Sequence, residues 1–153
     1  MALESEQVLR DVISEVLESM FFAMVEFEEC ESGDGSFDYA SEIHLTNHKG
    51  HIAICLRVSE EFARMITANF LGIEETQVSE DDLKDSLKEL ANMVGGGYHA
   101  RTNNEDRHLG IPSVWKMGCE GMDKTLADAG FGFAFCGQPA GSAVLSYLPG
   151  CGQ

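Results

Sequence analysis

The sequence predicts an α+β domain in which a largely antiparallel sheet is packed with three helices. Helical periodicity dominates the earlier part of the 153-residue chain. Residues 95–153 hold 12 of the 16 glycines and all three prolines, and their apolar residues fall in short strand-like segments between these turn formers. Early helices, late strands and short hairpin-like connections favour this arrangement over alternating βαβ units. We expect residues 1–153 to form a single domain, because neither part is large enough to favour independent folding.

The first expected element is a helix from Leu3 to Met24. Apolar residues recur at helical spacing on one of its faces: Val8, Leu9, Val12, Ile13, Val16, Leu17, Met20, Phe21 and Met24. Residues 26–31 alternate partly and precede a turn signal at Gly33-Asp34-Gly35. Residues 42–46 and 51–56 alternate at period two around Asn47-His48-Lys49-Gly50, which predicts a β-hairpin.

Two further helices carry recognisable end signals. Ser59 as the N-cap and Gly72 as the stop predict a helix from Ser59 to about Leu71. Ser79-Glu80-Asp81-Asp82 is a capping box with Asp in place of the usual Glu, and it starts a third, longer helix. We expect that helix to run through Gly95-Gly96-Gly97 to about Thr102, although an end at Val94 would also account for the glycines. Strands are then expected at residues 111–115, 130–136 and 142–147.

Charge and cysteine usage narrow the classes of function. A formal net charge of −16 disfavours binding to phosphate backbones and anionic lipid surfaces. The N-terminus has no basic region before an apolar run, so we do not expect a signal peptide. The number of cysteines is odd and no CxxC spacing occurs, which argues against a disulfide framework and a structural zinc site. We therefore expect a reduced, cytoplasmic protein with free thiols at Cys30, Cys55, Cys119, Cys136 and Cys151.

The third helix brings polar side chains together on one face. At about 100° per residue, this face carries Asp85, Glu89, Asn92 and Gly96. The opposite face carries the apolar stripe of Leu83, Leu87, Leu90, Ala91 and Val94. A solvated face is the ordinary explanation. However, Asn is a poor helix former, and each Gly inside a helix costs about 0.5–1 kcal/mol relative to Ala. Three glycines in a row indicate a kink, a close packing contact or a partner that approaches the backbone.

The spacing Asp85-x-x-x-Glu89-x-x-Asn92 resembles the active-site motif of the CheX branch of the CheC/CheX/FliY chemotaxis phosphatases. In that family the pattern is Asp or Ser, three residues, Glu, two residues, Asn, and a Pro some twenty residues on, which Pro112 supplies here. The segment Phe70-Leu71-Gly72-Ile73 and the acidic linker after it also look CheX-like. The chain departs from the family at Gly95-Gly96-Gly97, where Ala-Gly-Asn is common.

The resemblance implies a CheC/CheX-like fold and a phosphatase that hydrolyses the aspartyl phosphate of a CheY-like response regulator. Asn92 would hold the attacking water, because a carboxamide offers a donor and an acceptor without adding charge beside a phosphoryl group. Glu89 would pair with the regulator's active-site Lys and help to hold Asn92. Asp85, Gly96 and Pro112 are expected at the partner interface. The resemblance places Mg²⁺ on the regulator, gives this chain no cofactor of its own, and implies a homodimer paired through the sheets.

The sequence also allows alternative interpretations of the function and of the site. The chain could be a non-catalytic module that binds a regulator or signalling partner and kept the fold without hydrolysis. A second motif copy at Asp11-x-x-x-Glu15-x-x-Glu18 lacks the Asn, so we expect one site per chain and a solvated face there. Three histidines around the expected hairpin turn could bind a metal, but their spacing is not specific and surface histidines are favoured: His44, His48 and His51.

Overall fold

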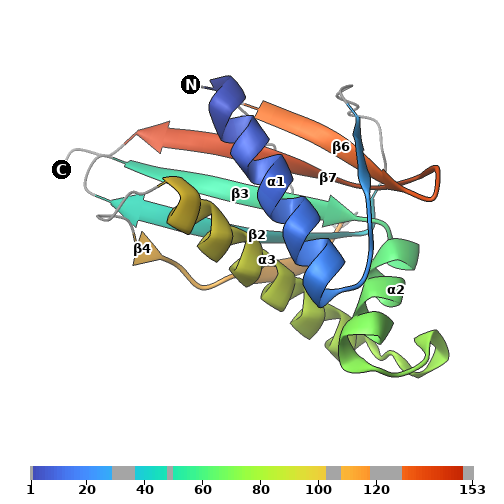
Figure 1. The fold of residues 1–153 in the computed structure, drawn as a ribbon. Helices are drawn as coiled ribbons and strands as arrows, with labels where there is room; N and C mark the ends of the chain where they lie inside the picture. The colour runs from blue at the N-terminus through green and yellow to red at the C-terminus, as the bar shows by residue number, and fades with distance from the viewer. Residues whose placement is uncertain (1, 29–36, 48–49, 103–107, 118–128, 150–153) are drawn as a thin grey trace.

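In the described part of the computed structural model, seven strands form a single antiparallel sheet, and helices cover one of its faces (Figure 1). The structure describes residues 2–28, 37–47, 50–102, 108–117 and 129–149. The strand order is β1-β6-β7-β3-β2-β4, and β5 pairs with β2 on the same side as β4. Three α-helices and an antiparallel sheet confirm the predicted fold class.

The elements follow one another along the chain in the predicted order. The helices are α1 (Ala2–Met20), α2 (Glu60–Leu71) and α3 (Glu80–Thr102), with a short 3₁₀ helix η1 (Glu75–Gln77) between the last two. The strands are β1 (Glu26–Glu28), β2 (Tyr39–Asn47), β3 (Gly50–Val58), β4 (His108–Leu109), β5 (Ser113–Lys116), β6 (Ala129–Phe135) and β7 (Gln138–Pro149). The predicted β2–β3 hairpin is confirmed, and its register places Asn47 opposite Gly50. The turn expected at Gly33-Asp34-Gly35 lies outside the described residues.

The first helix ends four residues earlier than its apolar periodicity predicts, at Met20 rather than Met24. Phe21 leaves the helix to become fully buried, where its ring stacks on Phe70 at 4.8 Å and its carbonyl accepts a hydrogen bond from Asn69 Nδ2 at 3.0 Å. A positive φ of 57° at Phe22 turns the chain, and Met24 points into solvent. The expected contribution of Met24 to the apolar face is therefore wrong, because the aromatic contact of Phe21 outweighs continuation of the helix.

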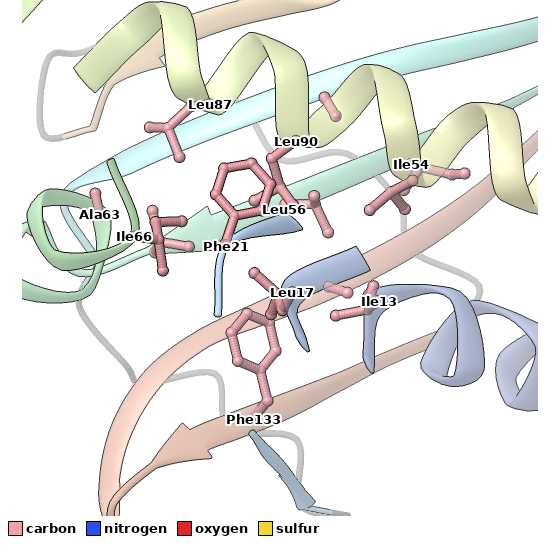
Figure 2. Close-up of a cluster of buried hydrophobic side chains, with 14 of the residues drawn as sticks. Ile13, Leu17, Phe21, Ile54, Leu56, Ala63, Ile66, Leu87, Leu90 and Phe133 are labelled. Carbon is pink, nitrogen blue, oxygen red and sulfur yellow. The ribbon is translucent and has the colours of Figure 1, made fainter. Parts of the chain in front are cut away.

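The core lies between the sheet and the three helices. Figure 2 shows side chains from α1, α3, β3 and β6 gathered between the helices and the sheet: Ile13 and Leu17, Leu87 and Leu90, Ile54 and Leu56, and Phe133. All these side chains are buried in one cluster. The predicted apolar stripe of α3 is confirmed, since Leu83, Leu87, Leu90, Ala91 and Val94 are all buried.

Small differences concern the later strands. The strand expected at residues 111–115 begins at Ser113 instead, since Pro112 has no N–H to donate to a ladder. The two-residue strand β4 and the helix η1 are too short to leave a periodic pattern in the sequence. The last strand is longer than expected, and its residues 141–149 pair with β3 over the whole length of β3.

Candidate functional site on helix α3

The outward face of α3 carries the predicted site residues together. Asp85, Glu89 and Asn92 are exposed, and Gly96 at the same angular position is half-buried. Within the described part of the chain, neither the Glu89 carboxylate nor the Asn92 amide takes part in a hydrogen bond or an ion pair. Both groups therefore present their full bonding capacity to a molecule that approaches from solvent.

The start of α3 is fixed by the predicted capping box. The backbone N–H of Asp82 donates to Ser79 Oγ at 3.0 Å, and the N–H of Ser79 donates to Asp82 Oδ2 at 3.1 Å. Arg64 of α2 donates to the carbonyl of Val78 at 2.9 Å just before the helix. These contacts fix where the helix begins, and burial of its apolar stripe turns the polar face outward.

The helix continues through all three glycines to Thr102, so the alternative end at Val94 is wrong. A Cβ at Gly95 would lie 2.9 Å from Ile43 Cγ2 and 3.0 Å from Leu109 Cδ1, both of which are too close. A Cβ at Gly97 would lie 2.8 Å from Val12 Cγ1. Two of the glycines thus allow α3 to pack closely against the sheet and against α1, which explains their presence without a kink.

Gly96 differs from its neighbours, because a Cβ there would meet nothing within 4 Å. It lies on the same face as Asn92, one helical turn further on. Packing among the described residues gives no reason for a glycine at this position. A bare backbone beside Asn92 leaves room for a partner to come close.

Pro112 is half-buried in the link between β4 and β5, along the free side of β2. This link is fixed at Gly110, whose N–H donates to the carbonyl of His44 at 2.8 Å. Figure 1 shows the chain leaving β4 and running beside α3 towards β5. The topology therefore brings the β4–β5 link, with Pro112 in it, alongside α3. A side-chain contact between Pro112 and the site residues remains a prediction.

The second motif copy is exposed, in keeping with a solvated face, and it has structural contacts of its own. Asp11 accepts a hydrogen bond from Gln7 Nε2 at 2.9 Å, and Glu15 forms an ion pair with Arg101 of α3. Glu18 is exposed. Glu15 therefore connects α1 to the end of α3.

The described part of the chain contains no group of three or more His, Cys, Asp or Glu side chains placed to hold a metal ion. The rings of His44 and His51 stack at 5.0 Å, and His44 Nε2 lies 3.4 Å from Glu42 Oε1. His48, Cys30, Cys119 and Cys151 lie outside the described residues. None of the helices within the described ranges is both long enough and apolar enough to span a membrane.

Comparison with known proteins assigns the family. The sequence model described as "Chemotaxis phosphatase CheX" matches residues 40–136, which is more than half of the chain and runs from the second residue of β2 through the end of β6. The chain belongs to the CheX family. The match covers Asp85, Glu89, Asn92 and Pro112. The search of curated proteins finds no match.

Solved structures confirm the CheX fold. The chemotaxis protein CheX from Vibrio vulnificus superimposes with a TM-score of 0.79 at 16% identity, covering 94% of this chain and 99% of that one. A CheX from Desulfovibrio desulfuricans gives 0.76 at 16% identity, with the same coverage of both chains. The CheX–CheY–BeF₃–Mg²⁺ complex from Borrelia burgdorferi gives 0.72 at 12% identity, covering 94% and 97%. At these identities the likeness concerns the fold alone.

The sequence did not single out Leu109 or Ile111. Both are exposed apolar residues, and Leu109 of β4 lies against Gly95 of α3. The period-two pattern placed Ile111 inside a strand, where exposure of one face is unremarkable. Its position outside β5 is visible only in the structure.

Proposed function

We propose that this CheX protein accelerates hydrolysis of the aspartyl phosphate of a CheY-like response regulator, in chemotaxis or another two-component pathway. The observation that carries the proposal is the exposed Glu89–Asn92 pair on α3, in a chain that belongs to a family of chemotaxis phosphatases. The CheX of Borrelia burgdorferi was solved in complex with CheY, BeF₃ and Mg²⁺, which supports a CheY-like partner here and Mg²⁺ on that partner.

The proposed chemistry needs positioning rather than a covalent intermediate. The Asn92 amide oxygen accepts a hydrogen bond from a water molecule held in line with the phosphorus–oxygen bond of the aspartyl phosphate. The water oxygen bonds to phosphorus, the bond to the aspartyl oxygen breaks, and the products are inorganic phosphate, the free carboxylate and a released proton. Asp in place of Asn92 would bring a second negative charge near the phosphoryl group, at a cost of roughly 1–4 kcal/mol at 4 Å.

Glu89 has the docking role in this proposal. It lies one helical turn before Asn92 on the same face, and its exposed carboxylate is available for a cationic side chain of the regulator. Asp85 extends the negative edge of the site, while Gly96 and Pro112 border it. We further propose that the chain is a cytoplasmic single domain that pairs through its sheet into a homodimer.

The decisive experiment measures phosphate loss from a phosphorylated CheY-like regulator in Mg²⁺, with wild-type protein, Asn92→Ala and Glu18→Ala. Wild type should accelerate phosphate loss, and Asn92→Ala should lower the rate by about 10²–10³-fold, as for loss of one positioned transition-state group. Glu18→Ala is a matched control on α1, and it should retain the wild-type rate.

A wild-type protein that binds phosphorylated regulators without accelerating phosphate loss would favour the non-catalytic binding module. Full activity in Asn92→Ala would show that the site lies elsewhere. Co-purification separates the two functions, because an adaptor can hold either form of the regulator, whereas a phosphatase should bind the phosphorylated form and release the product.

A further inference from the structure

Ile111 is an isoleucine whose side chain lies almost wholly in solvent. It is 89% exposed, more than any other large apolar residue in the described part of the chain. Its neighbour Leu109 is 37% exposed and packs against the Gly95 backbone with its inner side. Exposing an isoleucine forgoes the free energy of burying its side chain, and a partner that covered Ile111 would recover it.

The running direction of the chain places Ile111 beside the site. α3 runs the same way as β2: Gly95 lies over Ile43, and the start of the helix lies near Tyr39, whose pKa is raised by burial and then by the Glu80 carboxylate. The β4–β5 link runs the opposite way, since Leu109 pairs with Leu45 and Ser113 with Glu42. From its contact at Gly95, this link therefore runs back along α3 towards Asn92 and Glu89.

The rise per residue along the helix and along the link places Asn92 and Ile111 at nearly the same height along α3. Asn92 lies about 4.5 Å from Gly95 along the helix axis, at 1.5 Å per residue. Ile111 lies about 6.6 Å from Leu109, at 3.3 Å per extended residue. A Cβ on Gly95 would point towards Leu109. Around the helix axis, Asn92 is rotated from the direction of Gly95 by about 60° and Glu89 by about 120°. Asn92 is thus the site residue nearest to the link.

The link around Ile111 is held in place before any partner arrives. Gly110 is hydrogen-bonded to His44 at 2.8 Å, and a strand paired with β2 lies on either side. Proline fixes the φ angle of residue 112, and the β-branched side chain of Ile111 has few rotamers. Docking would therefore order little that is not already ordered, which favours affinity.

We infer that Ile111 is an apolar docking residue for the phosphorylated regulator, and that it packs against an apolar patch beside the regulator's phosphorylation site. The inference rests on the proposed function, because a regulator whose phosphoryl group reaches Asn92 comes close to the link that carries Ile111. The open position at Gly96 lies on the same side of the helix and leaves that approach free. Ile111 is assigned to binding alone and takes no part in the chemical step.

The test measures the dissociation constant of a CheY-like regulator loaded with Mg²⁺ and BeF₃⁻ for wild type and three variants. Ile111→Ser should raise the dissociation constant by about tenfold. Ile111→Val keeps most of the apolar surface and should change it by no more than about twofold. Met24→Ser is the matched control, since Met24 is 70% exposed and precedes β1 at the far edge of the sheet. It should leave the dissociation constant unchanged.

Saturating kinetics give a second readout, in which Ile111→Ser raises KM and leaves kcat unchanged. An unchanged dissociation constant in Ile111→Ser, with an unchanged melting temperature, would overturn the inference. A change in the molecular mass in solution with an unchanged dissociation constant would overturn it too, and would assign Ile111 to an interface between copies of this chain. Binding without hydrolysis in wild type defeats the proposed function alone, because the comparison of dissociation constants still decides the role of Ile111. Wild type that binds no loaded regulator overturns both.

Discussion

Val12 of α1 packs directly against the backbone of Gly97 in α3, so that a Cβ on Gly97 would lie 2.8 Å from Val12 Cγ1. On the other side of the helix, Gly95 packs in the same way against Ile43 of β2. The ion pair between Glu15 and Arg101 joins the same two helices. α3 is thus held from two sides, and the face that carries Asn92 is fixed in its direction.

Substitution of Gly97 by Ala tests this packing. The added methyl group would force Val12 or the helix to move, and we expect the free energy of unfolding to fall by about 1–3 kcal/mol. Gly96→Ala is the matched control: its Cβ meets nothing, and its higher helix propensity should raise the free energy of unfolding by about 0.5–1 kcal/mol. Urea denaturation of both variants measures the two effects. Equal stability of the two variants would contradict the close approach of α1 and α3.

Gly96→Ala also tests whether a partner uses the bare backbone beside Asn92. The variant should be folded and at least as stable as wild type, yet bind a Mg²⁺/BeF₃⁻-loaded CheY-like regulator more weakly, by about 3–10-fold, since one methyl group must be accommodated in the interface. Titration of the regulator measures the dissociation constant. If binding is unchanged, Gly96 is merely tolerated at this position and the partner does not approach the backbone there.

Substitution of Glu89 by Gln tests the docking carboxylate. The change keeps the size of the side chain and removes its charge, so we expect the dissociation constant for the loaded regulator to rise by about 10–100-fold, as for loss of a charge-assisted hydrogen bond. The difference between wild type and Glu89→Gln should shrink with added salt. Glu61→Gln removes another exposed charge, from α2, and should leave affinity almost unchanged. A loss of affinity in Glu89→Gln that does not depend on ionic strength would argue against a cationic partner for Glu89.

Local signals in the sequence predicted most of the fold. The caps at Ser59, Gly72 and Ser79 form as expected, because each depends on residues that lie close together in the chain. Gly72 has the left-handed conformation that ends α2, with a φ of 73°. The end of α1 was not predicted, because Phe21 leaves the helix to stack on Phe70, about fifty residues away in the chain. Periodicity within one segment cannot predict a contact with a distant residue.

The candidate site was predicted in part for the same reason. Glu89 and Asn92 belong to one helix, so their common face follows from helix geometry alone. The separate roles of the three glycines depend on which elements flank α3, and only the structure distinguishes Gly96 from Gly95 and Gly97. Likewise, the position of Ile111 beside the helix depends on pairing of β4 and β5 with β2, which brings residues some seventy positions apart into register.

The thiol of Cys55 gives a prediction that tests the sheet itself. Cys55 lies in β3 between β2 and β7, and burial, followed by the nearby Glu42 charge, raises its pKa from 9.0 to about 11. At pH 8 the thiolate fraction of the native protein should therefore be about 100-fold smaller than that of the unfolded chain. Iodoacetamide labelling at pH 8, followed by mass mapping, should modify Cys55 at least 100-fold more slowly in native protein than in urea. Cys136, which is exposed at the β6–β7 turn, should be labelled in the native protein.

The same shift in the pKa of Cys55 gives the sign of a pH effect on stability. Because the folded-state pKa is raised, the native protein holds the thiol proton more tightly than the unfolded chain does. The contribution to the free energy of unfolding is fully present below pH 9 and is lost as the pH rises through about 11, with a total of about 2–3 kcal/mol. Urea denaturation at pH 8 and pH 10.5 should show this loss, and Cys55→Ala should reduce the difference between the two pH values. An equal loss in Cys55→Ala would assign the alkaline sensitivity to another group.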